Sequence, residues 1–443
     1  MPSDAPVTAP IEQPGHALAK RLGGWKLIVT VAASLVVVLV VSFGIVAGIA
    51  IRNLTSSIQT IDLPGKEQPV LASIGELEGG FNVLIIGSDT RLGQGDQFGE
   101  VDSELNDVNI LVHVSENHDH ATVVSLPRDM LIDVPACLQE DGTMSRPRTM
   151  TALNATWGIG GMPCVVAAVE ETTGLEIGYA GVMTFTGVAQ LSTAIGGVEV
   201  CVTEPVFDPW SGLDIPEAGW TEIEGGQALA FLRTRKTVGD GSDLARISTQ
   251  QIYMAALVRT LRSDGVLTDI RKLYNIAHVA ANTMVLSSSL GSIDVMVSMA
   301  LALRNIPPEN IVFVQFPVLD APEPYSGRVV PDWRLANIVL DKIKADEPFS
   351  LEEGSDGRGS VVVDPPPSQD AAPAPAPEPE PSTPDASDDG AVSEDPTDTT
   401  PSDDPAPTPT PEPVPEVETV TEAEVISGLV GQSAADVTCA KVR

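Results

Sequence analysis

An uncharged segment near the N-terminus places the strongest constraint on how this chain folds. Residues 27–51 form a run of 25 residues without a charged side chain. A helix rises about 1.5 Å per residue, so about 20 apolar residues cross the hydrocarbon core of a bilayer. The apolar core of a cleaved signal peptide is shorter, roughly 7–15 residues, and no convincing small-residue cleavage site follows this run. We therefore predict an uncleaved transmembrane helix over residues 27–51.

The charges that flank this run predict its orientation. Lys20, Arg21 and Lys26 precede it, whereas only Arg52 follows it closely. Positive residues are retained on the cytoplasmic side of a membrane. We expect a single-pass protein of the plasma membrane, with residues 1–26 in the cytoplasm, a juxtamembrane linker over 52–79 and the remainder outside the cytoplasm.

The composition changes abruptly toward the C-terminus. Of the 37 prolines, 17 lie between positions 365 and 415, and residues 346–436 contain 23 acidic side chains and a single basic one. Such a segment cannot bury enough apolar surface to fold, so we predict a disordered acidic tail over 350–416. Residues 417–443 regain apolar character and either form a short helix or dock back on the domain. The formal net charge of −36 argues against nucleic acid as a partner.

Between these regions, residues 80–349 have the alternating periodicities of one α/β domain. Short apolar runs predict strands at 82–86, 108–114, 121–126, 198–202 and 311–316, of which the second and third form a hairpin. Helical spacing predicts helices at 164–173, 185–195, 247–261, 270–282, 293–304 and 332–344. This order indicates a mixed sheet that is covered by helices on both faces.

Two polar segments lie next to predicted strands. Asp89 and Arg91 follow the first strand, at the edge where open α/β sheets bind ligands. Asp107 precedes one strand of the hairpin, and Arg128 follows the other. If Asp89 and Asp107 converge, their carboxylates suit Mg²⁺. The alternative interpretation of the first segment is a plain polar turn.

A third segment concentrates arginines in an otherwise acidic chain. Read as a strand or an extended loop, residues 231–236 place Arg233 and Arg235 on one face. Arg246 and Gln250 are four residues apart and share one face of the helix that begins near Asp243. Guanidinium groups match phosphate oxygens bidentately. The segment predicts an anionic ligand, and surface salt bridges are the alternative.

Together these segments resemble a known family. Residues 81–89, 125–129, 196–201, 208–214 and 226–251 are similar, in the same order, to the LytR–CpsA–Psr domain over roughly residues 80–260. The resemblance implies a three-layer α/β/α fold with a mixed central sheet. It also implies a Mg²⁺-dependent phosphotransferase, or ligase, that moves a glycopolymer from a polyprenyl-pyrophosphate carrier to a hydroxyl of peptidoglycan.

The resemblance further implies roles for individual residues. Asp89 and Asp107 would hold the metal, and one of them would help to deprotonate the acceptor hydroxyl. The expected catalytic residues are Asp89, Asp107, Arg128, Arg233, Arg235 and Arg246. The expected pyrophosphate-binding residues are Arg91, Arg128, Arg233, Arg235, Asp243, Arg246 and Gln250. The chain departs from the family pattern at Leu105, Ala152 and Thr249, where relatives carry basic residues.

The cysteines and histidines have structural interpretations. Four cysteines in an extracytoplasmic chain allow two disulfides in three pairings. The resemblance implies a Cys137–Cys164 bridge, whereas the partner of Cys201 is open, with Cys439 as one possibility. The histidine-rich segment 117–120 invites a metal interpretation, but its place at a hairpin tip favours a solvated turn. His113, within a strand, is read as structural.

Two further functions are compatible with these patterns. A non-enzymatic envelope protein that binds lipid-linked glycans would account for the missing basic residues and the long tail. A LytR-type transcriptional regulator or attenuator is disfavoured, because 26 cytoplasmic residues are too few for a helix-turn-helix. Transfer of a glycan to peptidoglycan by the purified protein would distinguish the phosphotransferase from both of these functions.

Overall fold

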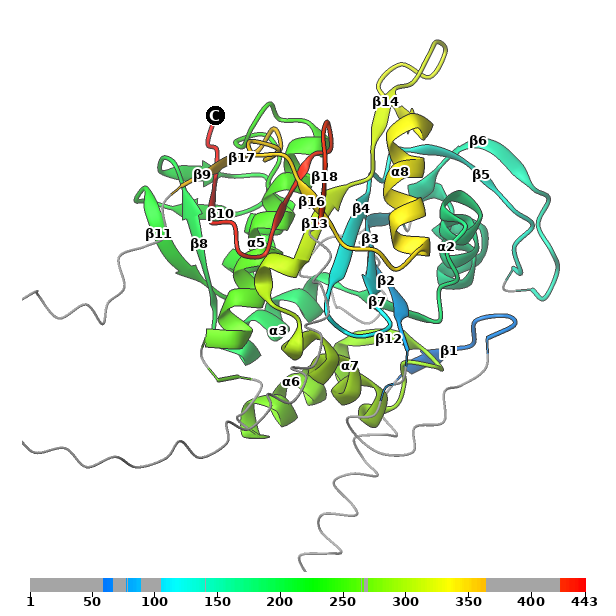
Figure 1. Cartoon of the computed structure of the whole chain (residues 1–443), viewed down its shortest axis with the longest axis horizontal. Coiled ribbons are helices and arrows are strands. Elements are labelled where there is room, and N and C mark those ends of the chain that lie inside the picture. The colour runs from blue at the N-terminus through cyan, green and yellow to red at the C-terminus, as the bar shows by residue number, and fades with distance from the viewer. Residues whose placement is uncertain are drawn as a thin grey trace, which may run out of the picture.

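A mixed eight-stranded sheet forms the centre of the molecule (Figure 1). The computed structural model describes residues 59–66, 77, 79–88, 105–139, 141–263, 265–266, 270–363 and 423–443. The strand order is β1-β12-β7-β2-β3-β4-β13-β19, with both parallel and antiparallel neighbours. The strands are β1 (Gln59–Ile61), β2 (Phe81–Ser88), β3 (Asn106–Val114), β4 (Ala121–Leu126), β7 (Tyr179–Met183), β12 (Met284–Ser287), β13 (Ile311–Gln315) and β19 (Gly431–Ser433).

Helices cover both faces of this sheet, as the sequence predicts. Helices α2 (Trp157–Thr173) and α8 (Trp333–Lys344) pack on one face, in a core that includes Leu84 and Leu111. Helices α5 (Asp243–Ser263) and α7 (Ile293–Asn305) pack on the other, with Ile110 and Phe313. Alternate side chains of the inner strands β2, β3, β4, β7 and β13 enter the two cores, because successive residues of a strand point to opposite faces. Around α5 and α7 lie α3 (Phe185–Ile195), α4 (Gly225–Arg233) and α6 (Ile270–Thr283).

A smaller sheet lies beside the main one, in the order β11-β8-β20-β17. It packs on α4 and α5 in a third apolar core, which contains Val200 and Phe231. Its strands are β8 (Val198–Val202), β11 (Gly219–Ile223), β17 (Ser360–Val362) and β20 (Thr438–Ala440). The remaining strands are β5 (Leu131–Val134), β6 (Arg148–Ala152), β9 (Val206–Asp208), β10 (Leu213–Ile215), β14 (Val318–Asp320), β15 (Val329–Pro331), β16 (Phe349–Leu351) and β18 (Glu424–Ile426). The described part of the chain also contains the 3₁₀ turns η2 (Leu153–Ala155) and η3 (Pro308–Asn310).

The C-terminal segment docks back on the domain as strands. Strand β19 extends the main sheet beside β13, β20 joins β8 and β17, and β18 pairs with β16. A disulfide joins Cys201 to Cys439, and a second joins Cys137 to Cys164, as the resemblance implies. Residues 350–363, which the sequence assigned to the tail, include the end of β16 and all of β17. The folded domain therefore extends past position 349.

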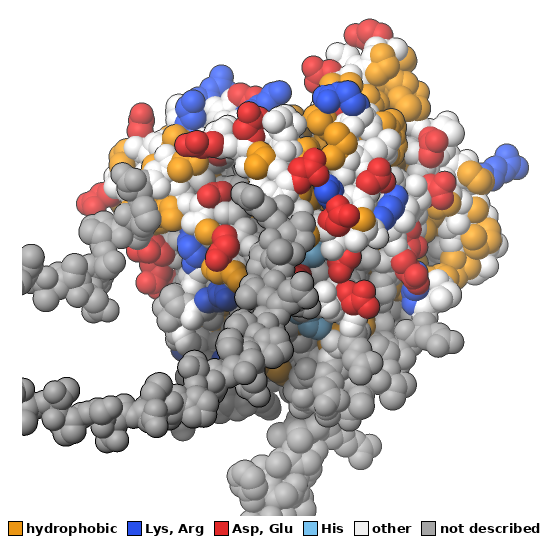
Figure 2. All heavy atoms as spheres, viewed as in Figure 1, with side chains coloured by type: hydrophobic (Ala, Val, Ile, Leu, Met, Phe, Trp, Pro, Cys, Tyr) orange, Lys and Arg blue, Asp and Glu red, His pale blue; other side chains and the backbone are white. Residues whose placement is uncertain are grey.

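Four predicted regions fall wholly or mostly outside the described residues: the cytoplasmic segment 1–26, the transmembrane run 27–51, the linker 52–79 and the tail beyond position 363. The linker nevertheless contains strand β1 of the main sheet. Among the helices that the structure does describe, none combines the length and the apolar character needed to cross a bilayer. On the face shown in Figure 2, acidic and basic side chains are interspersed rather than gathered in one large patch.

The prediction for the arginine segment is wrong. Its sequence pattern favours a strand or extended loop over residues 231–236, with Arg233 and Arg235 on one face. Instead, Arg233 is the last residue of α4, and the chain leaves the helix at Thr234, whose backbone is extended. Burial of Ala228 and Phe231 against α5 and β8 stabilises this nine-residue helix, which is too short for its pattern to be recognised alone.

Candidate active site

Charged side chains from three elements meet at one edge of the main sheet. Asn109 of β3 pairs with Leu126 of β4. Two residues further along this antiparallel register, Asp107 stands across from Arg128. The first turn of α5 brings Asp243 and Arg246 to the same place, three positions apart and therefore on one side of the helix.

These four residues form a continuous chain of ion pairs. The Arg128 Nη1 lies 2.5 Å from Asp107 Oδ1, and its Nε lies 3.3 Å from Asp243 Oδ1. The Arg246 Nη2 lies 2.8 Å from the same Asp243 oxygen and donates a hydrogen bond to the Asp107 carbonyl oxygen at 3.0 Å. Two arginines thus share one carboxylate, and both also hold the start of β3.

Several polar atoms of this cluster are buried without a hydrogen-bond partner among the described residues. They are the Nε of Arg128, the Nε of Arg246 and both carboxylate oxygens of Asp243. The ion pairs to Asp243 are close, but their alignment does not meet hydrogen-bond geometry. A buried polar group without a partner costs about 1–3 kcal/mol, and more when it is charged. Native proteins retain such groups where a ligand or a catalytic role accounts for them.

The two arginines of the cluster lie in different electrostatic environments. Burial lowers the pKa of Arg246, and the positive charges of Arg128 and Arg235 lower it further, against the opposite effect of Asp243 and Asp107. Burial also acts to lower the pKa of Arg128, but the nearby carboxylates, Asp107 first, outweigh it and raise the pKa overall. An anion placed between these guanidinium groups would relieve their mutual repulsion.

A pocket of about 310 Å³ lies at the predicted arginine segment. It is lined by Arg233, Arg235, Lys236, Asp208, Trp210, Ser211 and Gly241. Two of the lining residues form a cation–π contact, in which the Lys236 Nζ lies 4.1 Å from the ring centroid of Trp210. Its size is at the lower end of ordinary ligand pockets, about 300–1,000 Å³. Three basic side chains therefore share one pocket although α4 replaces the predicted strand.

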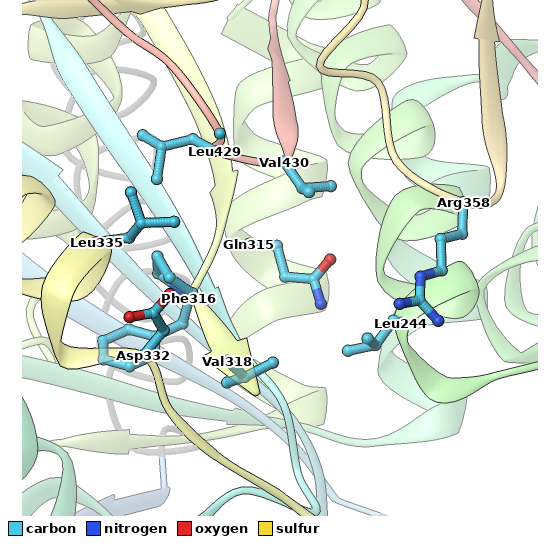
Figure 3. A pocket seen from close by; sticks show the side chains of 11 residues that line it. Leu244, Gln315, Phe316, Val318, Asp332, Leu335, Arg358, Leu429 and Val430 are labelled. Carbon is cyan, nitrogen blue, oxygen red and sulfur yellow. The ribbon is translucent and has the colours of Figure 1, made fainter. Parts of the chain in front are cut away.

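A smaller pocket of about 140 Å³ lies beside the start of α5 (Figure 3). Leu244 and Arg358 approach it from one side, and Leu335 and Leu429 from the other. Its volume is below the range of typical ligand pockets. We assign no ligand to it.

The remaining predicted residues have different positions. The Gln250 side chain donates a hydrogen bond to the Leu232 carbonyl oxygen at 3.2 Å, so it fixes the end of α4 next to Arg233. Thr249 is fully buried, with its hydroxyl bonded to the Ala245 carbonyl oxygen, and this position points into the protein. Asp89 and Arg91 lie outside the described residues.

Other charged residues around the site were not predicted. Asp208 accepts hydrogen bonds from the Thr234 hydroxyl (2.7 Å) and the Trp210 backbone N–H (3.0 Å), which shape the pocket wall. Asp129 binds Arg328 at 2.7 Å. The sequence contained a signal for two of the residues that were not predicted. Asp208 lies in a segment that carries the family resemblance, and Lys236 directly follows Arg235.

Several known proteins resemble this chain. A probable cell wall biosynthesis protein, LcpB of Corynebacterium glutamicum, is 34% identical over 195 residues, which are 42% of this chain and 44% of that protein. The cell wall biosynthesis protein LcpA of the same organism is 28% identical over 316 residues, 64% of this chain and 59% of LcpA. The polyisoprenyl-teichoic acid–peptidoglycan teichoic acid transferase TagT of Bacillus subtilis is 27% identical over 254 residues, 55% of this chain and 72% of TagT.

The match to the two corynebacterial proteins spans only about half of their length. The model of the LytR–CpsA–Psr family matches residues 50–332, which include the ion-pair cluster, the arginine pocket and most of the main sheet. The chain therefore belongs to the LytR–CpsA–Psr family.

Proposed function

We propose that this protein is a phosphotransferase that moves a glycopolymer from a polyprenyl-pyrophosphate carrier to peptidoglycan during cell-wall assembly. One observation carries the proposal: Arg246 is buried, the partly buried Arg128 lies beside it, and each has an Nε–H without a hydrogen-bond partner among the described residues. A pyrophosphate supplies oxygen acceptors for such donors. The names of the relatives, which include a teichoic acid transferase, support this choice of reaction.

The chemistry follows from the arrangement of charges. A hydroxyl of peptidoglycan attacks the phosphorus that carries the glycan, and a new P–O bond forms. The bond to the bridging oxygen breaks, and the polyprenyl phosphate leaves with that electron pair. Arg128, Arg246 and Arg235 stabilise the negative charge that builds on the leaving phosphate. The proton of the hydroxyl passes to a carboxylate at the site edge, for which Asp107 is the described candidate.

Of the two expected metal ligands, Asp107 is described, and its carboxylate is compatible with the proposed Mg²⁺ ion. Asp107 has a side chain that is 23% exposed, and only its Oδ1 contacts Arg128. Carboxylate oxygens combined with waters and phosphate oxygens form the ligand set that Mg²⁺ prefers. Asp107 would hold the ion together with Asp89. When bound, the ion neutralises charge on the pyrophosphate.

A half-buried apolar surface next to the cluster supports a lipid carrier. Val83, Ile85, Val108 and Val112 lie on the face of the main sheet under α5 and α7, and each is only partly buried. On the neighbouring strand β4, Val123 of the same face is buried, with 6% of its surface exposed. The polyprenyl chain of a carrier would cover these positions, and Val108 directly follows Asp107. We further propose that the predicted helix 27–51 holds the domain on the outer face of the plasma membrane, where such a carrier is found.

A transfer assay with the full chain in detergent tests this function. The protein is incubated with Mg²⁺, a polyprenyl-pyrophosphate-linked glycan and peptidoglycan, and covalent product is measured. We expect product from the wild type and from Arg334→Ala, a control whose side chain is 73% exposed. We expect transfer by Arg246→Ala to be slower by roughly 10–100-fold. Binding of the lipid-linked glycan without transfer would replace this proposal with the non-enzymatic one, and full activity of Arg246→Ala would contradict the role of the cluster.

A further inference from the structure

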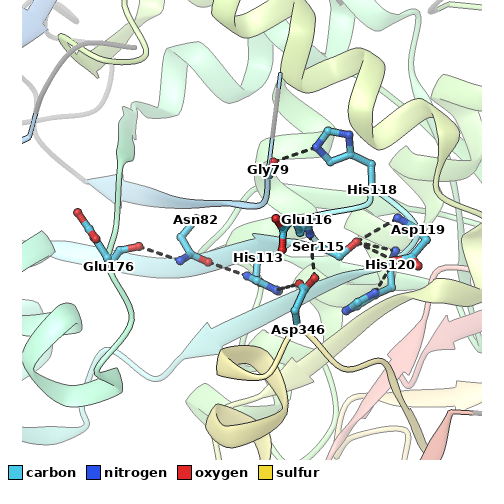
Figure 4. Close-up of polar contacts among 10 residues, drawn as sticks. All are labelled: Gly79, Asn82, His113, Ser115, Glu116, His118, Asp119, His120, Glu176 and Asp346. Atoms are coloured by element: carbon cyan, nitrogen blue, oxygen red, sulfur yellow. Dashed lines mark hydrogen bonds and ion pairs between the residues drawn. The ribbon is translucent and has the colours of Figure 1, made fainter. Parts of the chain in front are cut away.

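A second polar cluster lies at the opposite end of the β3–β4 hairpin. His113 is near the end of β3, His120 directly precedes β4, and Asp346 follows α8 (Figure 4). One possible ligand atom from each of the three lies within 4.8 Å of the other two. Six residues of extended strand separate His113 from Asp107, which corresponds to about 20 Å. The cluster is therefore separate from the proposed transfer site.

The hydrogen bonds of Asn82 fix the tautomer of His113. The Asn82 Nδ2 donates to the Glu176 carbonyl oxygen at 2.8 Å, so the amide oxygen must be the atom that faces the imidazole. That oxygen lies 2.9 Å from His113 Nδ1, which is consequently the protonated nitrogen. In neutral His113, the Nε2 then carries a lone pair. This lone pair points at Asp346 Oδ1, 3.3 Å away, so two acceptors face each other.

His120 has the same arrangement. Its Nδ1 lies 2.7 Å from the Asp119 carboxylate, an acceptor, so this nitrogen carries the proton. The Nε2 of His120 is then the nitrogen left for the cluster. A histidine that binds a metal commonly donates its other ring N–H to a carboxylate or carbonyl group in this way. Both imidazoles thus have the partner on Nδ1 that a metal-binding histidine requires.

The backbone holds Asp346 in position as the third ligand. Its φ of 55° is in the left-handed region, which residues other than glycine seldom adopt. This turn aims the carboxylate at the hairpin, where Oδ2 accepts a hydrogen bond from the Glu116 backbone N–H at 3.0 Å and leaves Oδ1 facing His113. Asp346 and His113 are more than 200 residues apart in the sequence, so their contact depends on the whole fold.

We propose that His113, His120 and Asp346 bind one divalent transition-metal ion, with Zn²⁺ as the ion that this donor set suits. Two imidazole nitrogens and one carboxylate oxygen, completed by water, form a common four-coordinate zinc site. With zinc–ligand distances of about 2.0–2.1 Å, tetrahedral neighbours lie about 3.3 Å apart. The distance of 3.3 Å between His113 Nε2 and Asp346 Oδ1 matches this value.

Burial and access are also suited to a metal. The side chains of His113 and His120 are 10% and 7% exposed, whereas that of Asp346 is 31% exposed and provides a path from solvent. The ion would fasten the hairpin to the end of α8.

Zinc titration of the full chain in detergent tests the proposal. The protein is first treated with a chelator, and Zn²⁺ is then added in the presence of excess Mg²⁺, which occupies carboxylate sites. We expect one Zn²⁺ per chain by calorimetry, and a four-coordinate visible spectrum when Co²⁺ replaces it. His120→Gln and Asp346→Asn should weaken binding by more than the roughly 10–100-fold caused by loss of groups that only orient metal ligands.

Two matched variants serve as controls. His118→Gln changes a histidine of the same hairpin, whose Nε2 contacts the Gly79 carbonyl oxygen instead of the cluster. Asp107→Asn removes a carboxylate of the proposed transfer site. Both should bind one Zn²⁺ with wild-type affinity. The proposal is overturned if the wild type binds no zinc, as a simple His113–Asp346 ion pair would predict. It is also overturned if His120→Gln and Asp346→Asn bind zinc as the wild type does.

Discussion

The shared carboxylate of Asp243 provides a sharp test of the ion-pair cluster. Arg246→Met removes the cation that lies 2.8 Å from this carboxylate and leaves only Arg128, 3.3 Å away. Removal of one partner from a buried ion pair typically costs about 3–5 kcal/mol, because the other charge stays buried. We expect the free energy of unfolding, measured by urea denaturation, to fall by about this amount.

The double variant Asp243→Asn/Arg246→Met separates stability from catalysis. Because the uncompensated charge is now absent, part of the lost stability should return, with a coupling energy of roughly 1–3 kcal/mol between the two positions. Transfer should stay impaired. One charge-assisted hydrogen bond to the transition state is worth about 1.5–3 kcal/mol, which corresponds to roughly 10–100-fold in kcat/KM.

Two outcomes would refute this reasoning. If transfer by the double variant returned to the wild-type rate, Arg246 would serve only to neutralise Asp243. If the two substitutions were additive in stability, the ion pair would not contribute to folding. Arg262→Met is the matched control on the same helix: its guanidinium contacts the Ile306 carbonyl oxygen, and its loss should leave the transfer rate unchanged.

Three further predictions concern the C-terminal strands and the arginine pocket. Replacement of both Cys201 and Cys439 by Ala should lower the free energy of unfolding in urea by about 2–5 kcal/mol, since the bridge closes a long loop; an unchanged midpoint would contradict this. Gly431→Ala should cost about 1–3 kcal/mol, because a Cβ would overlap a backbone carbonyl of β13, and hydrogen exchange should show the amides of β19 losing protection. Burial acts to raise the pKa of Asp208, but hydrogen bonds, first that from Thr234, outweigh it and lower the pKa below its ordinary 3.8. This carboxylate therefore contributes stability above about pH 4 that is lost as the pH falls further, and Asp208→Asn should flatten that part of the stability profile.

Local signals explain which elements could be predicted from the sequence. Helix α3 has the predicted limits, because the Thr184 side chain accepts a hydrogen bond from the Gly187 N–H at one end and Gly196 adopts a φ of 103° at the other. Helix α2 ends as predicted at Gly174, with a φ of 66°. Such caps depend on the residues immediately next to each helix end, so they can be recognised in the sequence. The C-terminal strands have three residues each, too few for a periodic pattern, and their pairing depends on distant partners.

The transfer site and the histidine cluster also differ in how far they could be predicted from the sequence. The family resemblance identified Asp107, Arg128, Asp243 and Arg246, and the hairpin register accounts for why the first two meet. Spacing alone could not show that α5 adds the other two, because folding over more than 100 residues brings them there. The histidine cluster was read as a solvated turn and a structural strand residue. Its third member, Asp346, is 226 residues from His120, beyond the reach of any local pattern.

The docked C-terminus has a consequence for the acidic segment between positions 363 and 423. The Val363 N–H bonds to the Val437 carbonyl oxygen, and Cys439 is bonded to Cys201. Both ends of the segment are thus held by one folded body, which makes it a closed loop instead of a free tail. A protease that cuts this loop once should leave a nicked molecule of unchanged mass on a non-reducing gel. Only reduction would release the short C-terminal fragment, so the chain tolerates a break at its most acidic region without losing its last strands.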